Sequence, residues 1–186
     1  MLRHLPNALT LLRILLVGPL VWLLLHGDYA STLIGFALAA VTDAVDGLLA
    51  KRFGWTSDLG KVLDPLADKL LLVAMFVTLS VLGLAPVWLA VLVVARDVVI
   101  AVGALLFRLN FGVLGGRPTP VSKLNTLCQI LFVLAVTARA AGAALAEPVL
   151  MTLGALVMVT TVVSGLDYVL RYASRAQALR RERAGR

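Results

Sequence analysis

The segment TDAVDGLLAKRFGWTSDLGKVLDPLADK, residues 42–69, carries five aspartates within 28 residues of a strongly apolar chain. Of the 186 residues, 61% are apolar and only 15% are charged, and the mean hydropathy is +0.98. A soluble globular domain has a much larger share of charged and polar residues. The composition therefore indicates an integral membrane protein, and the acidic segment connects two of its apolar stretches.

Apolar stretches of about 20 residues are long enough to cross the hydrocarbon core of a bilayer as helices. Six such stretches fill the chain, at residues 8–26, 30–50, 64–83, 86–107, 121–143 and 148–170. Turn-forming residues such as Gly27, Gly83 and Pro148 fall between them or at their ends. We expect an all-α integral membrane protein with six transmembrane helices in one bundle, which forms a single domain over residues 1–186.

Lysine and arginine predict the orientation of this bundle. The basic flanks are at Arg3, in the segments 51–61 and 108–123, and in the tail 171–186, whereas only Arg139 falls on the opposite side. Because cytoplasmic loops carry an excess of Lys and Arg, we expect both termini and the acidic segment on the cytoplasmic side of the cell (inner) membrane. The net charge of +7 then requires no nucleic-acid partner. The basic cytoplasmic tail either binds anionic lipid headgroups or serves only as a topology signal.

Four of the aspartates form two pairs with helical spacing. Asp43 and Asp46 are three residues apart, and Asp64 and Asp68 are four residues apart, so each pair shares one face of a helix. At a rise of about 1.5 Å per residue, both pairs lie roughly 4–12 Å below the lysines that flank their helices. The two pairs therefore match in depth across an antiparallel hairpin, just beneath the cytoplasmic surface.

These carboxylates need positive charge nearby, because one charged aspartate at mid-span costs roughly 3 kcal/mol on the insertion scale. Carboxylate oxygens without histidine or thiolate neighbours favour Mg²⁺, Mn²⁺ or Ca²⁺, and four carboxylates are enough for two ions. Ion pairing with Lys51, Arg52 or Lys69 is an alternative, and Asp64 before Pro65 also has the pattern of a helix N-cap. A cap explains one aspartate, whereas a divalent-metal site explains all four.

The spacing as a whole reads Asp43-x2-Asp46-Gly47-x2-Ala50-Lys51-x8-Gly60-x3-Asp64-x3-Asp68. It resembles the signature of the CDP-alcohol phosphatidyltransferase family, D-x2-D-G-x2-A-R-x8-G-x3-D-x3-D, which marks a six-helix membrane enzyme. Seven of the eight fixed residues are present. The departure is Lys51, where the family has arginine, so that a point charge replaces a bidentate fork.

The resemblance implies metal-dependent transfer of a phosphatidyl group from a CDP-linked lipid to an alcohol, with release of CMP, by a homodimer. It implies that Asp43, Asp46 and Asp64 are ligands of Mg²⁺ or Mn²⁺, and that Asp68 is a ligand or the catalytic base. Two ions clamp the diphosphate in this chemistry, while the base takes the proton of the attacking hydroxyl. Because neither histidine lies near the cluster, direct displacement is favoured over a covalent intermediate.

Two glycines and two polar residues match the part of the family pattern that accommodates the cytidine diphosphate. Gly47, Lys51 and Gly60 match fixed positions, and Ser57 is a weaker match. A missing side chain leaves room for a ligand, although close helix packing also selects glycine.

The second half of the chain bears on the acceptor alcohol. Arg96-Asp97 lies inside an apolar stretch, where it is either a neutralised structural pair or part of an acceptor site. Arg117 and Lys123 lie in RPTPVSKLNT, residues 117–126. They either contact an acceptor phosphate or only set the topology.

This half resembles the CMP-forming cardiolipin synthases of the family, in RDVVIAVGALLF, residues 96–107, and in RPTPVSKLNT. The related phosphatidylglycerophosphate synthases typically have arginine where this chain has Ala104, and lysine where it has Asn125. Those differences remove charge suited to glycerol 3-phosphate. The expected substrates are therefore CDP-diacylglycerol and phosphatidylglycerol, giving cardiolipin and CMP, with glycerol 3-phosphate as the alternative acceptor.

A cation transporter with intramembrane carboxylates is the alternative from another functional class. Transporters place such groups near the midplane between structural repeats. Here the acids lie at one end of one hairpin, and residues 1–85 have no counterpart in residues 86–186. The sequence therefore favours the enzyme.

Overall fold

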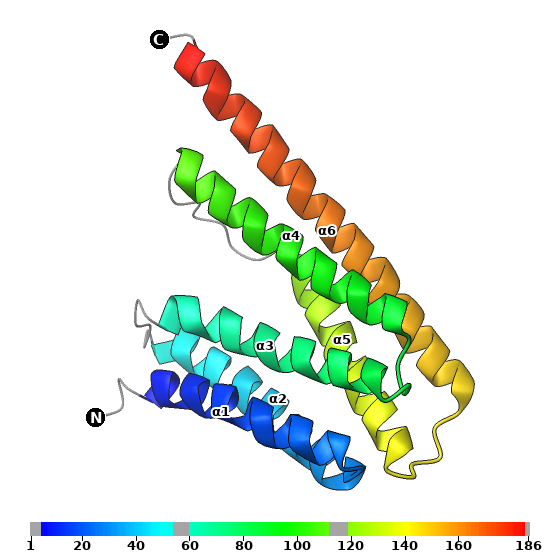
Figure 1. The fold of residues 1–186 in the computed structure, drawn as a ribbon. Helices are drawn as coiled ribbons and strands as arrows, with labels where there is room; N and C mark the ends of the chain where they lie inside the picture. Colours follow the sequence, from blue (N-terminus) through cyan, green and yellow to red (C-terminus); the bar gives the residue numbers. More distant parts are fainter. Residues whose placement is uncertain (1–4, 54–59, 112–118, 185–186) are drawn as a thin grey trace.

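The computed structural model describes residues 5–53, 60–111 and 119–184, with side chains for residues 11–45, 69–107, 109–110, 119–175 and 177. Within these ranges all regular structure is helical, which confirms the all-α class (Figure 1). The six helices are α1 (Leu5–Leu25), α2 (Tyr29–Phe53), α3 (Gly60–Val81), α4 (Val87–Phe111), α5 (Pro120–Ala140) and α6 (Glu147–Ala184).

The length and apolar composition of its helices indicate that this chain is a multi-pass membrane protein. Three helical segments are long and apolar enough to cross a bilayer: Val87–Phe107, Pro120–Ala140 and Glu147–Arg175. In the other helices, the apolar segments within the described residues are shorter: Leu11–Leu25, Tyr29–Val45 and Lys69–Val81. The segments of α1, α2 and α3 are bounded by the described side chains, at Leu11, Val45 and Lys69, so three of the six spans that the sequence predicts are supported within the described residues.

Local chemistry explains where the helices begin. The backbone N–H of Ser31 donates to Asp28 Oδ1 at 3.1 Å, which caps α2 and lowers the pKa of the Asp28 carboxyl. The preceding Gly27 has a φ of 78°, a backbone conformation that glycine adopts without strain. At α5, the N–H of Ser122 donates to the Thr119 hydroxyl at 3.2 Å, and Pro120 occupies the first turn.

The helices pack as two groups that share a contact zone. α1 packs against both α2 and α3, and α6 packs against both α4 and α5. Contacts of α5 with α2 and α3, and of α3 with α4, join the groups. In Figure 1, α1 to α3 lie together, while α4 and α6 run side by side at an angle to them. The acid-bearing helices α2 and α3 therefore meet the second half of the chain at α5, and α3 also meets it at α4.

Apolar side chains fill this contact zone. Met75, Phe76 and Val133 have no exposed surface, and the rings of Phe76 and Phe132 stack with centroids 5.6 Å apart. Many large apolar side chains remain exposed on the outside, for example Leu15 at 63%. Such a surface is suited to contact with lipid tails.

A buried amide joins α5 to α6. Asn125 is fully buried, and its Oδ1 accepts hydrogen bonds from Thr160 at 2.9 Å and from Thr161 at 2.8 Å. Interhelical hydrogen bonds of this kind contribute on average about 0.6 kcal/mol each in membrane proteins. Asn125 therefore stabilises the packing of α6 on α5.

We expect Asn125→Leu to lower the Tm of the purified protein by roughly 2–4 °C, because both interhelical hydrogen bonds are lost. The measurement is thermal unfolding in detergent micelles. Leu124→Ala is the control, since the neighbouring Leu124 is 52% exposed and its truncation should leave the Tm nearly unchanged. An Asn125→Leu variant as stable as the wild type would contradict this account of the helix interface.

Candidate active site

The acidic motif is distributed over two helices that both pack against α1. Asp43 and Asp46 lie in α2, and Asp64 and Asp68 lie in α3, so the helical spacing predicted for both pairs is confirmed. Because α3 begins at Gly60, Asp64 is inside the helix and the interpretation of Asp64 as an N-cap is wrong. Each pair therefore occupies one face of its own helix.

Several predicted site residues fall outside the described part of the structure. The side chains of Asp46, Lys51, Asp64 and Asp68 lie outside the described residues, Gly47 and Gly60 are described only as helix backbone, and Ser57 and Arg117 lie outside entirely. Their assignments stay predictions. Asp43 is the one motif aspartate whose side chain is described.

Asp43 is paired with a residue that the sequence analysis did not identify. Nη2 of Arg13, in α1, lies 2.6 Å from Asp43 Oδ1. The Arg13 side chain is only 8% exposed, whereas that of Asp43 is 39% exposed. The sequence contains one sign of this role, because Arg13 is a single arginine inside the apolar run LTLLRILLV, residues 9–17. A charged residue within a membrane span is a functional candidate by default.

The donor set fits a hard divalent cation. Asp43 keeps a second carboxylate oxygen, and its partial exposure leaves the carboxylate accessible. All four motif side chains are carboxylates, the ligands that Mg²⁺ and Mn²⁺ prefer. Among the described side chains, no group of three His, Cys, Asp or Glu residues is close enough together to hold a metal. The side chains of Asp46, Asp64 and Asp68 are outside this described part of the chain.

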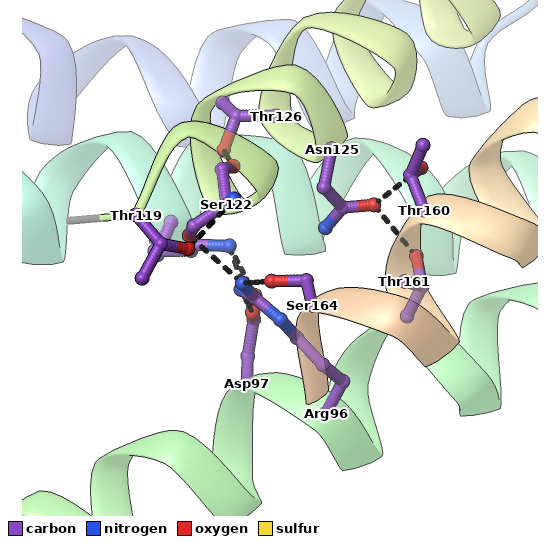
Figure 2. Close-up of polar contacts among 10 residues, drawn as sticks. Arg96, Asp97, Thr119, Ser122, Asn125, Thr126, Thr160, Thr161 and Ser164 are labelled. Carbon is purple, nitrogen blue, oxygen red and sulfur yellow. Dashed lines mark hydrogen bonds and ion pairs between the residues drawn. The ribbon is translucent and has the colours of Figure 1, made fainter. Parts of the chain in front are cut away.

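A second charged cluster is centred on Arg96 (Figure 2). Its Nη1 donates to Asp97 Oδ1 at 2.7 Å, and its Nη2 donates to the hydroxyls of Ser122, at 2.8 Å, and Ser164. The Arg96 side chain is only 5% exposed. These contacts bring α4, α5 and α6 together at one guanidinium.

Lys69 connects this cluster to α3. Its Nζ donates to both carboxylate oxygens of Asp97, at 2.7 and 2.9 Å. Asp97 is 15% exposed and therefore lies between two cations, Lys69 and Arg96. The sequence offers Lys69 as a counter-ion of the motif aspartates, and among the described side chains it pairs with this carboxylate of α4. These three side chains carry one surplus positive charge.

The other predicted acceptor-site positions have different surroundings. The Lys123 side chain is exposed in the first turns of α5, directly after Ser122, which contacts Arg96. Ala104 is half-buried in α4. Asn125 is buried against α6, so a lysine at this position would extend its apolar stem and charged ammonium from within a helix interface. The difference from phosphatidylglycerophosphate synthases at residue 125 therefore concerns helix packing as well as charge.

Known proteins are similar to this chain along most of its length. Residues 3–166 match the CDP-alcohol phosphatidyltransferase family. The "Probable phosphatidylglycerophosphate synthase" of Mycobacterium tuberculosis (strain CDC 1551 / Oshkosh) is 32% identical over 177 residues, which cover 90% of this chain and 81% of that protein. The "Cardiolipin synthase (CMP-forming)" of Homo sapiens is 34% identical over 146 residues, covering 70% of this chain and 48% of that protein.

A third relative, the "CDP-diacylglycerol--glycerol-3-phosphate 3-phosphatidyltransferase" of Bacillus subtilis (strain 168), is 37% identical over 109 residues. The match covers 50% of this chain and 56% of that protein. The names of these relatives differ in the alcohol, but the family match includes both acidic pairs and the Arg96 cluster. The chain is a transferase that belongs to the CDP-alcohol phosphatidyltransferase family.

Proposed function

We propose that this protein transfers the phosphatidyl group of CDP-diacylglycerol to phosphatidylglycerol, giving cardiolipin and CMP. The observation that carries the transferase chemistry is the pair of acidic motifs on α2 and α3, two helices that both pack on α1. Family membership favours this chemistry over cation transport. Transfer to glycerol 3-phosphate is the second candidate, because two of the relatives described above are named for phosphatidylglycerophosphate synthesis.

Asp43, Asp46 and Asp64 would hold Mg²⁺ or Mn²⁺, with two ions in the site and Asp68 as a further ligand or as the base. Bound divalent ions supply positive charge to the diphosphate and to the CMP oxygen that departs. As the base, Asp68 would take the proton of the acceptor hydroxyl, whose oxygen would bond to the phosphorus of the phosphatidyl group while the bond to CMP breaks. Gly47, Lys51, Ser57 and Gly60 would accommodate the cytidine diphosphate.

The acceptor would lie near Arg96, with Arg117 and Lys123 at the cytoplasmic end of this region. Phosphatidylglycerol has a single phosphodiester charge, whereas glycerol 3-phosphate is close to a dianion at neutral pH. The uncharged residues Ala104 and Asn125, where the sequence lacks arginine and lysine, support the lipid acceptor, because an unneutralised second charge is costly in a partly desolvated site.

All six helices would cross the cell (inner) membrane, with both termini and the active site on the cytoplasmic side. Arg139, the basic residue expected on the opposite side, forms an ion pair with Glu147. The excess of Lys and Arg on the other side supports that orientation, because the positive-inside bias counts basic residues. The chain would act as one domain over residues 1–186, with the basic tail 171–186 in the cytoplasm, and as a homodimer.

We expect the purified enzyme with CDP-diacylglycerol and Mn²⁺ to make cardiolipin from phosphatidylglycerol and to use glycerol 3-phosphate poorly. Mass spectrometry of the products, with each acceptor offered separately and then in competition, is the measurement. An enzyme preparation treated with EDTA is the control for metal dependence. Efficient formation of phosphatidylglycerophosphate without cardiolipin would contradict the proposed acceptor and support the second candidate.

Asp43→Asn, Asp46→Asn and Asp64→Asn should each lower the rate of CMP release by at least about 100-fold, because each removes a proposed metal ligand. Asp167→Asn is a matched control. Asp167 is an aspartate of α6 that lies outside the motif and forms an ion pair with Arg171. This variant should retain near wild-type activity. Folding of each variant is checked by size-exclusion chromatography, and a folded motif variant that keeps full activity at saturating Mn²⁺ would exclude that residue as an essential ligand.

A further inference from the structure

Arg13 lies deep in the first apolar helix and faces the acid-bearing helices. Its Nη2 contacts Asp43 Oδ1 at 2.6 Å, and its side chain is 8% exposed. The helix that carries it, α1, packs against both α2 and α3. A guanidinium does not deprotonate in proteins, so its charge is permanent and must be compensated where it is buried. Arg13 is therefore a fixed positive charge built into the wall of the acidic region.

The contact uses one of the two oxygens of Asp43. The Asp43 side chain is 39% exposed, so the carboxylate has surface available to a second cation. Arginine and a divalent ion would then neutralise the same negative charge. When two cations share one group of carboxylates, removal of either cation increases the stabilisation that the other provides.

We propose that Arg13 is the internal counter-ion of the aspartate cluster, which stabilises the Asp43 carboxylate in the absence of divalent metal. The inference rests on the metal site of the proposed function. It has two consequences that do not involve catalysis. The metal-free protein loses stability without Arg13, and divalent metal restores more stability to that variant than it adds to the wild type.

The test is thermal unfolding of the purified full chain in detergent, with EDTA or with saturating Mn²⁺. Arg13→Gln should lower the metal-free Tm by about 4 °C or more, and the upward shift caused by Mn²⁺ should exceed the wild-type shift by a similar amount. Arg171→Gln is the control, because Arg171 pairs with Asp167 within α6 and is 64% exposed. Its Mn²⁺ shift should equal that of the wild type.

A double variant gives a second test. If Arg13→Gln alone is too unstable to purify, the variant that also carries Asp43→Asn should still be recovered folded, and failure to recover it while Asp43→Asn alone is folded would overturn the inference. If Arg13→Gln can be purified, the Tm values are compared directly. Asp43→Asn should raise the metal-free Tm in the Arg13→Gln background by more than it does in the wild-type background, because it removes the carboxylate that lost its partner. An equal effect in both backgrounds, or equal Mn²⁺ shifts in Arg13→Gln and wild type, would overturn the inference while leaving the proposed function intact. No Mn²⁺ shift in any variant would overturn the metal site and the inference together.

Discussion

Compensation of charge inside an apolar helix bundle is the constraint on which the rest of this structure depends. An unpaired charge at mid-span costs roughly 3 kcal/mol on the insertion scale, so a partner has to come from another helix or from a bound ion. Arg13 of α1 pairs with Asp43 of α2, and Lys69 of α3 pairs with Asp97 of α4. The contacts that lower this cost therefore also fix the positions of neighbouring helices.

In the proposed function, the donor and acceptor sites lie in different halves of the chain. The motif acids belong to α2 and α3, and Arg96 draws together α4, α5 and α6 through Asp97, Ser122 and Ser164. Lys69 directly follows Asp68 in α3 and bonds Asp97 in α4. The helix that carries the proposed base is thus connected to the region proposed for the acceptor, which would keep the two substrates in a fixed relation.

Patterns local in sequence predicted much of this arrangement. Apolar runs and turn residues predicted the six helices, and the spacing of the aspartates placed each pair on one helix face. Contacts between distant residues could not be read in this way, because spacing along one helix does not say which side chain of another helix lies opposite. Arg13 with Asp43, Lys69 with Asp97, and Asn125 with Thr161 are all of this kind. The alternative interpretation of Asp64 as a cap failed because α3 begins at Gly60, five residues before Pro65.

The central claim is that the acids of α2 and α3 are compensated by divalent cations as well as by arginine. Electron paramagnetic resonance of free Mn²⁺, in equilibrium with purified protein that carries no histidine tag, measures the number of ions bound per chain. The account predicts about two ions per chain, with at least one of them lost in Asp64→Asn. Absence of Mn²⁺ binding, or binding that Asp64→Asn leaves unchanged, would contradict it.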